Sequence, residues 1–279
     1  MKIIWFIKQS IILDFKFFKV SKWSFGKKLE FIFKKYIVLL KHLVKPFKLG
    51  EDSEQLFGET IFYGSRFGFA DYQGILARHQ KLIAISQLKI KKRGVIVDVG
   101  ANVGFFSKLI RDLHPDSSIY AIEPVPVIFD CLKKNFSGDK DIHFYNIAIS
   151  QKTKRVTMEF NAERGEVSKI SKNGNIQIEA KSLDDFIEEQ KIKGIDLLKI
   201  DTEGFEELVL SGAYKALSIT NYLFIEVTIK DNPNYTLSSL MSHLCSKDFN
   251  FNLLAFRNFG DTSEGKAPLL DCLMKNVRN

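Results

Sequence analysis

The sequence predicts an α/β fold in which a doubly wound, mainly parallel sheet carries helices on both faces. From residue 95 onward, short apolar runs typical of buried strands alternate with segments whose apolar residues recur at helical spacing. Strands that alternate with helices are typical of parallel sheets covered on both sides. The chain has 279 residues, 45% of them hydrophobic, which is enough to bury such a core without disulfide or metal cross-links.

The first 50 residues differ in charge from the rest of the chain. They hold 12 lysines and two acids, a net charge of +10, so residues 51–279 sum to −2 within the chain's total of +8. A nucleic-acid-binding surface on the main body is therefore not expected. Lysines mixed with Trp, Phe, Ile and Leu predict a basic amphipathic helical segment, 1–50, before a main domain, 51–279. Pro46 and Gly50 mark the boundary.

Three states of this N-terminal segment stay open at the level of sequence. Residues 1–48 either lie on an anionic membrane surface, pack as a cap on the main domain, or are disordered. Secretion and a transmembrane anchor are disfavoured, because Lys8 interrupts the first apolar run and no run approaches the ~20 apolar residues that span a bilayer. The expected location is cytoplasmic, with peripheral contact at the inner face of the membrane as one alternative.

The cysteines support an intracellular environment. Cys131, Cys245 and Cys272 are scattered and odd in number, which is typical of free thiols in a reducing cytoplasm rather than of a disulfide framework.

The elements of the main domain follow in order along the chain. Strands are expected at 95–100, 118–124 and 142–150, with helices at 105–114 and 125–136 between them. RVTMEF and NIQIEA then alternate apolar and polar residues, which predicts an antiparallel excursion within 155–180. The rest of the chain returns to alternation. A helix at 182–190 opens with Ser182 as its cap, and the further elements are a strand at 195–201, a helix at 205–213, a strand at 222–228, a helix at 236–248 and two closing strands at 251–258 and 269–277.

The strongest local motif is VIVDVGANVGFFS, which joins the first strand to the first helix. Gly100 permits a backbone shape that a Cβ would obstruct, and Asn102 tolerates left-handed dihedral angles. Such a tight turn lets a ligand approach the backbone and the start of the helix. The motif therefore predicts a ligand site after residue 99.

Two cofactors use a turn of this kind. NAD sites require G-x-G-x-x-G, whereas this chain has G-x-N-x-G with Asp98 just before it. A carboxylate there would repel a pyrophosphate but would suit the cationic amino-acid portion of S-adenosylmethionine. Glu123, at the end of the second strand, can accept the ribose hydroxyls of either cofactor. The balance favours the methyl donor.

Two other functions remain open at this point. One is an NAD-type, nucleotide-dependent sugar-modifying oxidoreductase or epimerase, and the other is a non-enzymatic, membrane-associated interaction module with the same fold.

Several segments resemble the successive motifs of the FkbM family of S-adenosylmethionine-dependent methyltransferases: VIVDVGANVGFFS, IYAIEPVPVIFDCLKKN, NIAIS, KSLDDFIEE and IDLLKIDTEGFEELVLSGA. The resemblance covers residues 95–228. It implies a Rossmann-like class I methyltransferase fold and a reaction that usually methylates a hydroxyl oxygen. The expected function is an O-methyltransferase that acts on a sugar, glycan or glycolipid precursor.

The resemblance also assigns residues to the cofactor, S-adenosyl-L-methionine. Those expected at or beside its methionine portion are Asp98, Gly100, Ala101, Asn102, Gly104 and Phe105. Those expected at the ribose and the adenine are Glu123, Pro124, Asn146 and Ala148.

Candidate catalytic residues follow the fourth strand. KIDTEG places Asp201 at the strand end and Glu203 on the next loop. Because an acceptor hydroxyl benefits from a base that removes its proton, Asp201 and Glu203 are the first candidates, with Glu226 as a further one and Lys199 as an orienting cation. Asp201 as a helix cap and a structural ion pair between Lys199 and Asp201 are the alternatives.

No metal site is expected. Asp201 and Glu203 are two acids without an identifiable third ligand, and oxygen-rich cation sites need several convergent groups. The five histidines show no ligand spacing.

Overall fold

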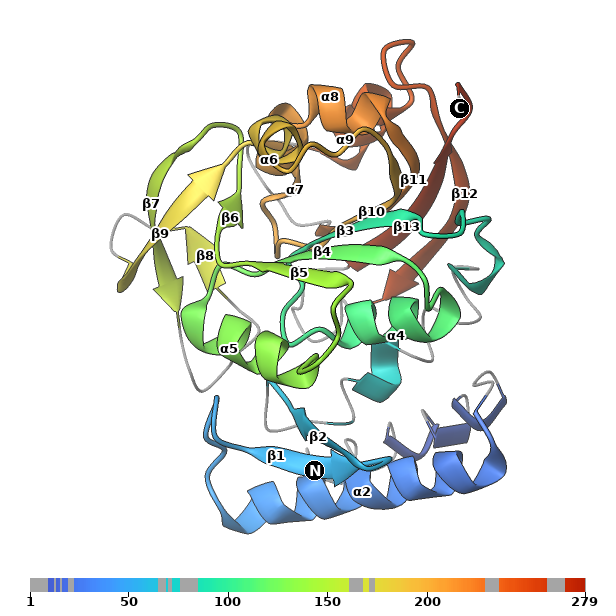
Figure 1. Cartoon of the computed structure of the whole chain (residues 1–279), viewed down its shortest axis with the longest axis vertical. Coiled ribbons are helices and arrows are strands. Elements are labelled where there is room, and N and C mark those ends of the chain that lie inside the picture. Colours follow the sequence, from blue (N-terminus) through green and yellow to red (C-terminus); the bar gives the residue numbers. More distant parts are fainter. Residues whose placement is uncertain are drawn as a thin grey trace.

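The computed structural model describes residues 10–12, 14–15, 17–19, 23–64, 69, 72–75, 85–160, 168–170, 174–228, 236–259 and 269–278. A seven-stranded sheet forms the centre of the molecule, a smaller sheet lies to one side of it, and the long helix α2 lies at the opposite end from α6 and α8 (Figure 1). The predicted α/β architecture is confirmed.

The central sheet has the strand order β12-β13-β11-β10-β3-β4-β5. Its strands are β3 (Val95–Val99), β4 (Ser118–Ile122), β5 (Ile142–Tyr145), β10 (Ile195–Ile200), β11 (Thr220–Thr228), β12 (Phe251–Phe259) and β13 (Leu269–Asn276). The pairs from β5 to β11 are parallel, and β13 pairs antiparallel with both β11 and β12. The last strand of the chain therefore lies inside the sheet, and β12 forms the edge.

Helices cover both faces of this sheet. The helices α4 (Phe105–Leu113) and α5 (Pro126–Asn135) pack on one face, where their apolar side chains meet Ile96 and Leu197. The helices α6 (Leu183–Glu189), α7 (Glu206–Ser211), α8 (Tyr214–Ser218) and α9 (Leu237–Leu244) pack on the other, where they meet Val97 and Leu198. Neighbouring residues of one strand thus face opposite layers, as the period of two along a strand requires.

The smaller sheet confirms the predicted antiparallel excursion. Its order is β6-β9-β7-β8, formed by β6 (Ala148–Ile149), β7 (Lys154–Phe160), β8 (Ser168–Ile170) and β9 (Ile176–Lys181). The strand β7 pairs antiparallel with β8 and β9, whereas β6 pairs parallel with β9.

One predicted strand is wrong in its extent, because residues 142–150 form two strands in different sheets. The chain leaves the central sheet at Asn146, whose side-chain amide donates hydrogen bonds to the carbonyl oxygens of Glu123 and Pro124, at 2.9 Å each. A side chain that bonds to a neighbouring backbone in this way favours a turn over a continued strand.

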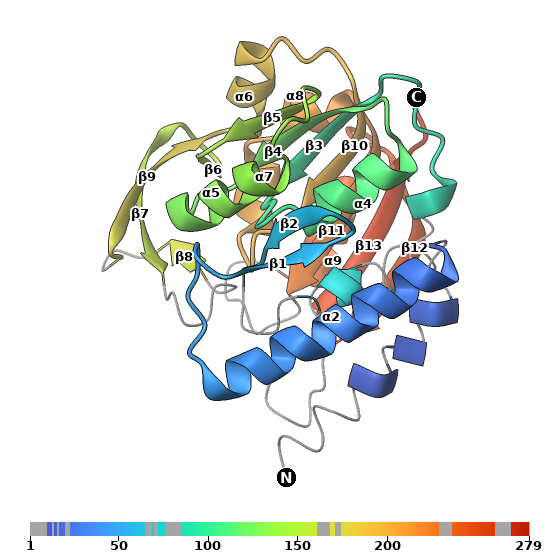
Figure 2. The same cartoon turned by 60° about the horizontal axis from the view of Figure 1, so that its bottom comes forward.

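The N-terminal segment packs on the main body. The helix α2 (Phe25–Val44) lies alongside the hairpin of β1 (Ser53–Leu56) and β2 (Glu59–Phe62) (Figure 2). Phe31 and Val38 of α2 are fully buried in one cluster with hairpin residues and with Phe105 of α4. The inner face of α2 is therefore a packed cap, one of the three states that the sequence left open. No helix within the described part of the chain has the length and apolarity needed to cross a bilayer.

Two polar contacts fix this cap in place. Lys35 of α2 is fully buried, where it forms an ion pair with Asp14 and donates a hydrogen bond to Gln73 Oε1 at 3.1 Å. Asn135 of α5 bonds both the N–H and the carbonyl of Phe62 in β2, and its amide also donates to the Val103 carbonyl at 2.8 Å. The hairpin is thereby connected to the turn that follows β3. A short 3₁₀ helix, η1 (Ile85–Gln87), precedes β3.

Candidate active site

The turn between β3 and α4 depends on backbone conformations that favour glycine. Gly100, Asn102 and Gly104 have φ values of 77°, 52° and 90°. A Cβ on Gly100 would lie 1.9 Å from the carbonyl oxygen of Asp201. Gly100 therefore permits both the turn and the close approach of the chain that leaves β10.

Glu123 fixes the other side of this turn. One oxygen of its carboxylate accepts the N–H of Asn102 and the other accepts the N–H of Val125, each at 2.9 Å. Burial raises the pKa of Glu123 to about 7, although the two N–H donors oppose the shift. Each carboxylate oxygen has a second acceptor position, so Glu123 can still receive a ribose hydroxyl.

Lys199 is a buried residue that connects the ends of β3 and β10. Its ammonium donates to the Gly100 carbonyl at 2.7 Å and forms ion pairs with Asp98 at 3.1 Å and Asp201 at 3.3 Å. Burial alone would lower the pKa of Lys199, but the two carboxylates outweigh burial and raise it, so this lysine is cationic. The predicted ion pair between Lys199 and Asp201 is confirmed.

Asp98 lies in the interior, behind the turn. Its side chain is fully buried, accepts a hydrogen bond from Ser107 Oγ at 2.6 Å and pairs with Lys199. The structure thus gives Asp98 a role in holding Lys199 and Ser107. A direct contact between Asp98 and a cofactor stays a prediction.

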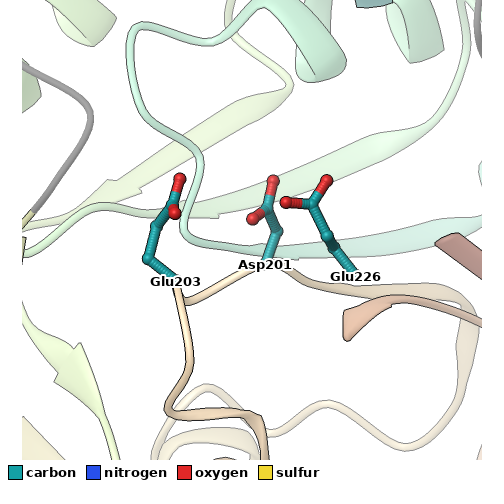
Figure 3. A group of neighbouring side chains, drawn as sticks. All are labelled: Asp201, Glu203 and Glu226. Atoms are coloured by element: carbon teal, nitrogen blue, oxygen red, sulfur yellow. The ribbon is translucent and has the colours of Figure 1, made fainter. Parts of the chain in front are cut away.

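Three carboxylates converge beside the turn. Asp201, Glu203 and Glu226 offer oxygen atoms that all lie within 4.8 Å of one another, and their side chains point to the same side (Figure 3). Glu226 was predicted as a catalytic candidate, but not as the third acid of this group. It reaches this position because β11 pairs parallel with β10 in a register that places Ile225 beside Ile200. Such a group can take up a proton or surround a cation.

The helix-cap alternative for Asp201 is not what the structure shows. The helix α7 begins at Glu206 with Phe205 at its N-cap position, four residues beyond Asp201.

Glu206 is a supporting residue that sequence reasoning missed. It is 1% exposed, and one of its oxygens accepts hydrogen bonds from the N–H and the hydroxyl of Thr202 and from the N–H of Gly204, at 3.0–3.2 Å. These bonds hold the loop in which Glu203 adopts a φ of 55° and is exposed. An acid in the first turn of a helix is the signal that could have identified it.

One cleft brings together the residues predicted for cofactor binding and for catalysis. It encloses about 740 Å³, counting space open to solvent. The predicted residues in its lining are Gly100, Asn102, Glu123, Pro124, Ala148, Asp201 and Glu203. The other predicted residues are not part of that lining: Asp98, Ala101, Gly104, Phe105, Asn146, Lys199 and Glu226.

The cleft also has an apolar wall that sequence reasoning missed. Ile149 and Met158 line it from the smaller sheet, and Phe205 lines it from the loop before α7. Alternation in 155–160 predicted a strand here, but it could not predict which layer the strand would face.

The cleft residues fit S-adenosylmethionine by their chemistry. Glu123 offers acceptors for a ribose, the apolar wall offers a surface for an adenine, and the negative charge of the lining favours a cationic sulfonium. No phosphate-binding group is required for this arrangement.

Comparison with known proteins decides the family. A model of the methyltransferase FkbM domain matches residues 98–252, which is more than half of the chain. The chain belongs to the FkbM methyltransferase domain family. S-adenosylmethionine is therefore its methyl donor, and the nucleotide-dependent oxidoreductase and the non-enzymatic module are set aside.

Several curated relatives of this FkbM-family protein are methyltransferases. The 2-O-methyltransferase NoeI of Sinorhizobium fredii is 23% identical over 169 residues, which cover 53% of this chain and 68% of NoeI. The hexuronic acid methyltransferase AglP of Haloferax volcanii is 25% identical over 188 residues, 64% of this chain and 77% of AglP. The methyltransferase sdnD of Sordaria araneosa is 30% identical over 153 residues, 42% of this chain and 59% of sdnD. The chain thus spans between 59% and 77% of these relatives.

Among solved structures, M. jannaschii TYW2 in complex with AdoMet superposes with a TM-score of 0.46 and 12% identity, covering 84% of this chain and 90% of TYW2.

Proposed function

We propose that this FkbM-family protein transfers a methyl group from S-adenosylmethionine to a hydroxyl oxygen of a sugar, glycan or glycolipid precursor. The observation that carries the proposal is the single cleft in which Gly100 and Glu123 share the lining with Asp201 and Glu203. The printed activities of NoeI and AglP, a 2-O-methyltransferase and a hexuronic acid methyltransferase, support an oxygen acceptor on a sugar.

Each cleft residue has a role in this proposal. When bound, S-adenosylmethionine supplies an electrophilic methyl group on a sulfonium. Glu123 holds the ribose, and Asp201 removes the proton of the acceptor hydroxyl, because Lys199 fixes its carboxylate at 3.3 Å beside the turn. Glu203 and Glu226 orient the acceptor by accepting hydrogen bonds from its other hydroxyls.

The test is a transfer assay with a methyl-labelled donor. The purified full chain is incubated with a panel of free hexoses, hexuronic acids and nucleotide-linked sugars, and products are read by mass spectrometry. We expect one labelled methyl group on a sugar oxygen. Asp201→Asn should lower kcat by at least about 100-fold, the usual scale for loss of a general base, while S-adenosylhomocysteine still binds.

The matched control replaces an acid outside the cleft. Asp130→Asn, on the exposed side of α5, should leave kcat unchanged. Transfer only to non-sugar acceptors, or full activity of Asp201→Asn, would contradict the proposed acceptor or the proposed base respectively.

The proposed location is the cytoplasm. Cys131 and Cys272 are buried free thiols, which fits a reducing compartment.

A further inference from the structure

The helix α2 is apolar on two opposite faces, and the main body covers one of them. Phe31 and Val38 on the inner face are fully buried. The outer face carries large apolar side chains that are between 48% and 89% exposed: Phe25, Leu29, Phe33, Leu40, Leu43 and Val44. Among the described residues, nothing buries this outer set.

The exposed set forms a continuous stripe along the helix. With 3.6 residues per turn, these six positions fall within an arc of about 100°, opposite Phe31 and Val38. A helix of 20 residues is about 30 Å long, so the stripe extends over roughly that length. Phe15, in the segment before α2, is also 69% exposed. Contiguous apolar surface of this extent is typical of an interaction site.

Charge indicates what this surface binds. Residues 1–50 carry 12 lysines against two acids. Lys34 and Lys41 pair with Glu54 and Asp52 of the body, which holds α2 in place. Lys19 and Lys45, which precede and follow the helix, are exposed, whereas Lys27 lies on the inner side of α2, over the Phe57 ring.

A second copy of the chain is a poor partner for this surface. A symmetric dimer through the stripe would bring two strongly cationic segments together, because an isologous interface pairs the same patch on both subunits. An anionic lipid surface satisfies both the apolar stripe and the lysines.

We propose that the outer face of α2 docks on an anionic membrane surface. The helix axis lies parallel to the bilayer, the stripe enters the boundary between headgroups and acyl chains, and the exposed lysines meet the lipid phosphates. Docking uses no residue of the cleft and is independent of the methyl-transfer reaction.

The experiment is co-sedimentation of the full chain with phosphatidylcholine vesicles that contain or lack phosphatidylserine. We expect the wild-type chain to sediment with the anionic vesicles and to be released by added salt, because exposed charge pairs are screened. The variant Phe33→Gln/Leu40→Gln/Val44→Gln should lose at least about tenfold in apparent affinity, since it removes three apolar groups from the contact. Glutamine retains helix propensity, so α2 should persist.

The matched control makes the same kind of change on another exposed apolar surface. Leu254→Gln/Phe256→Gln lies on the edge strand β12, distant from α2 in Figure 1, and should sediment as the wild-type chain does. The affinity of each variant for S-adenosylhomocysteine is measured in parallel, which separates a failure of docking from a failure of the active site.

Three results would overturn the proposal. These are a wild-type chain that stays in the supernatant with anionic vesicles, a triple variant that binds as tightly as the wild type, and a stable wild-type dimer that the triple variant loses.

Discussion

Glu123 is a buried acid of the cleft whose pKa is raised. Its carboxylate is 5% exposed, holds the turn through Asn102 and lines the cleft. Burial disfavours the ionised carboxylate of Glu123, which is the form that accepts hydrogen bonds from a ribose. The pKa of Glu123 is therefore raised to about 7, and this carboxyl group changes protonation near neutral pH.

Stability should therefore depend on pH through Glu123. The folded-state pKa is raised to about 7 from an ordinary value of 4.5, so between these pH values the folded chain retains a proton that the unfolded chain has lost. The stabilising contribution is fully present below about pH 4.5 and is lost as the pH rises through about 7. The loss is on the order of 3 kcal/mol.

Urea denaturation across this pH range measures the effect. Glu123→Gln should show a flatter dependence of the unfolding free energy on pH than the wild type. Glu51→Gln, a change at a largely exposed glutamate, should keep the wild-type slope. Identical slopes for the wild type and Glu123→Gln would show that Glu123 does not titrate in this window.

At the scale of secondary-structure elements, the candidate active site is built from the segments that follow β3 and β10. Because the two strands are parallel neighbours, the turn after Val99 and the loop after Ile200 emerge at the same edge of the sheet. Lys199 binds to both of them. The distance between turn and loop is set by the missing side chain of Gly100.

Gly100→Ala should disrupt this pair of elements. The added Cβ would meet the Asp201 carbonyl at 1.9 Å, so the loop must move and the affinity for S-adenosylhomocysteine should fall by more than about tenfold. Gly138→Ala is the matched control, because Gly138 also has a positive φ, 91°, but no neighbouring atom within 4 Å. That variant should cost only the left-handed backbone penalty, about 1–2 kcal/mol. Calorimetric titration with S-adenosylhomocysteine measures the affinity of both variants. Equal affinities of Gly100→Ala and Gly138→Ala would contradict the steric explanation.

In the molecule as a whole, the helix α2 is part of the folded body. The buried cluster that contains Phe31 also contains Leu56 and Ile61 of the hairpin and Ile128 of α5. Shared burial of this kind couples the unfolding of α2 to that of the methyltransferase body.

Two phenylalanines separated by one residue test this coupling. Phe31→Ala removes a fully buried ring and should lower the unfolding free energy by about 3–5 kcal/mol. Phe33→Ala removes a ring that is 65% exposed and should change it by no more than about 0.5 kcal/mol. Denaturant unfolding followed by circular dichroism gives both values. A separate early transition for α2, or equal effects of the two variants, would show that the segment folds independently.

Local patterns were sufficient for most elements. Most strands and helices from 95 to 277 were predicted from apolar periodicity, whereas α8 and β8 were not. The cap at Ser182 is confirmed by its hydrogen bond from the Asp185 N–H. The break between β5 and β6 at Asn146 was not predicted, because the alternation of apolar and polar residues continues through residues 142–150. The side chain of Asn146 donates a hydrogen bond to the Glu123 carbonyl, just after β4, and this contact is not visible in a local pattern.

The alternation of strands and helices, the turn at Gly100 and the family motifs can be read from the amino-acid sequence, because each depends on residues close together in the chain. Which side chains meet depends on the folded chain. Strand order places Glu226 beside Asp201 and turns Asp98 inward onto Lys199, and packing on the hairpin buries one apolar face of α2 and leaves the other exposed. Periodicity predicts which residues share one face of a helix or strand. The residues that this face contacts are set by packing between segments that are distant in the chain.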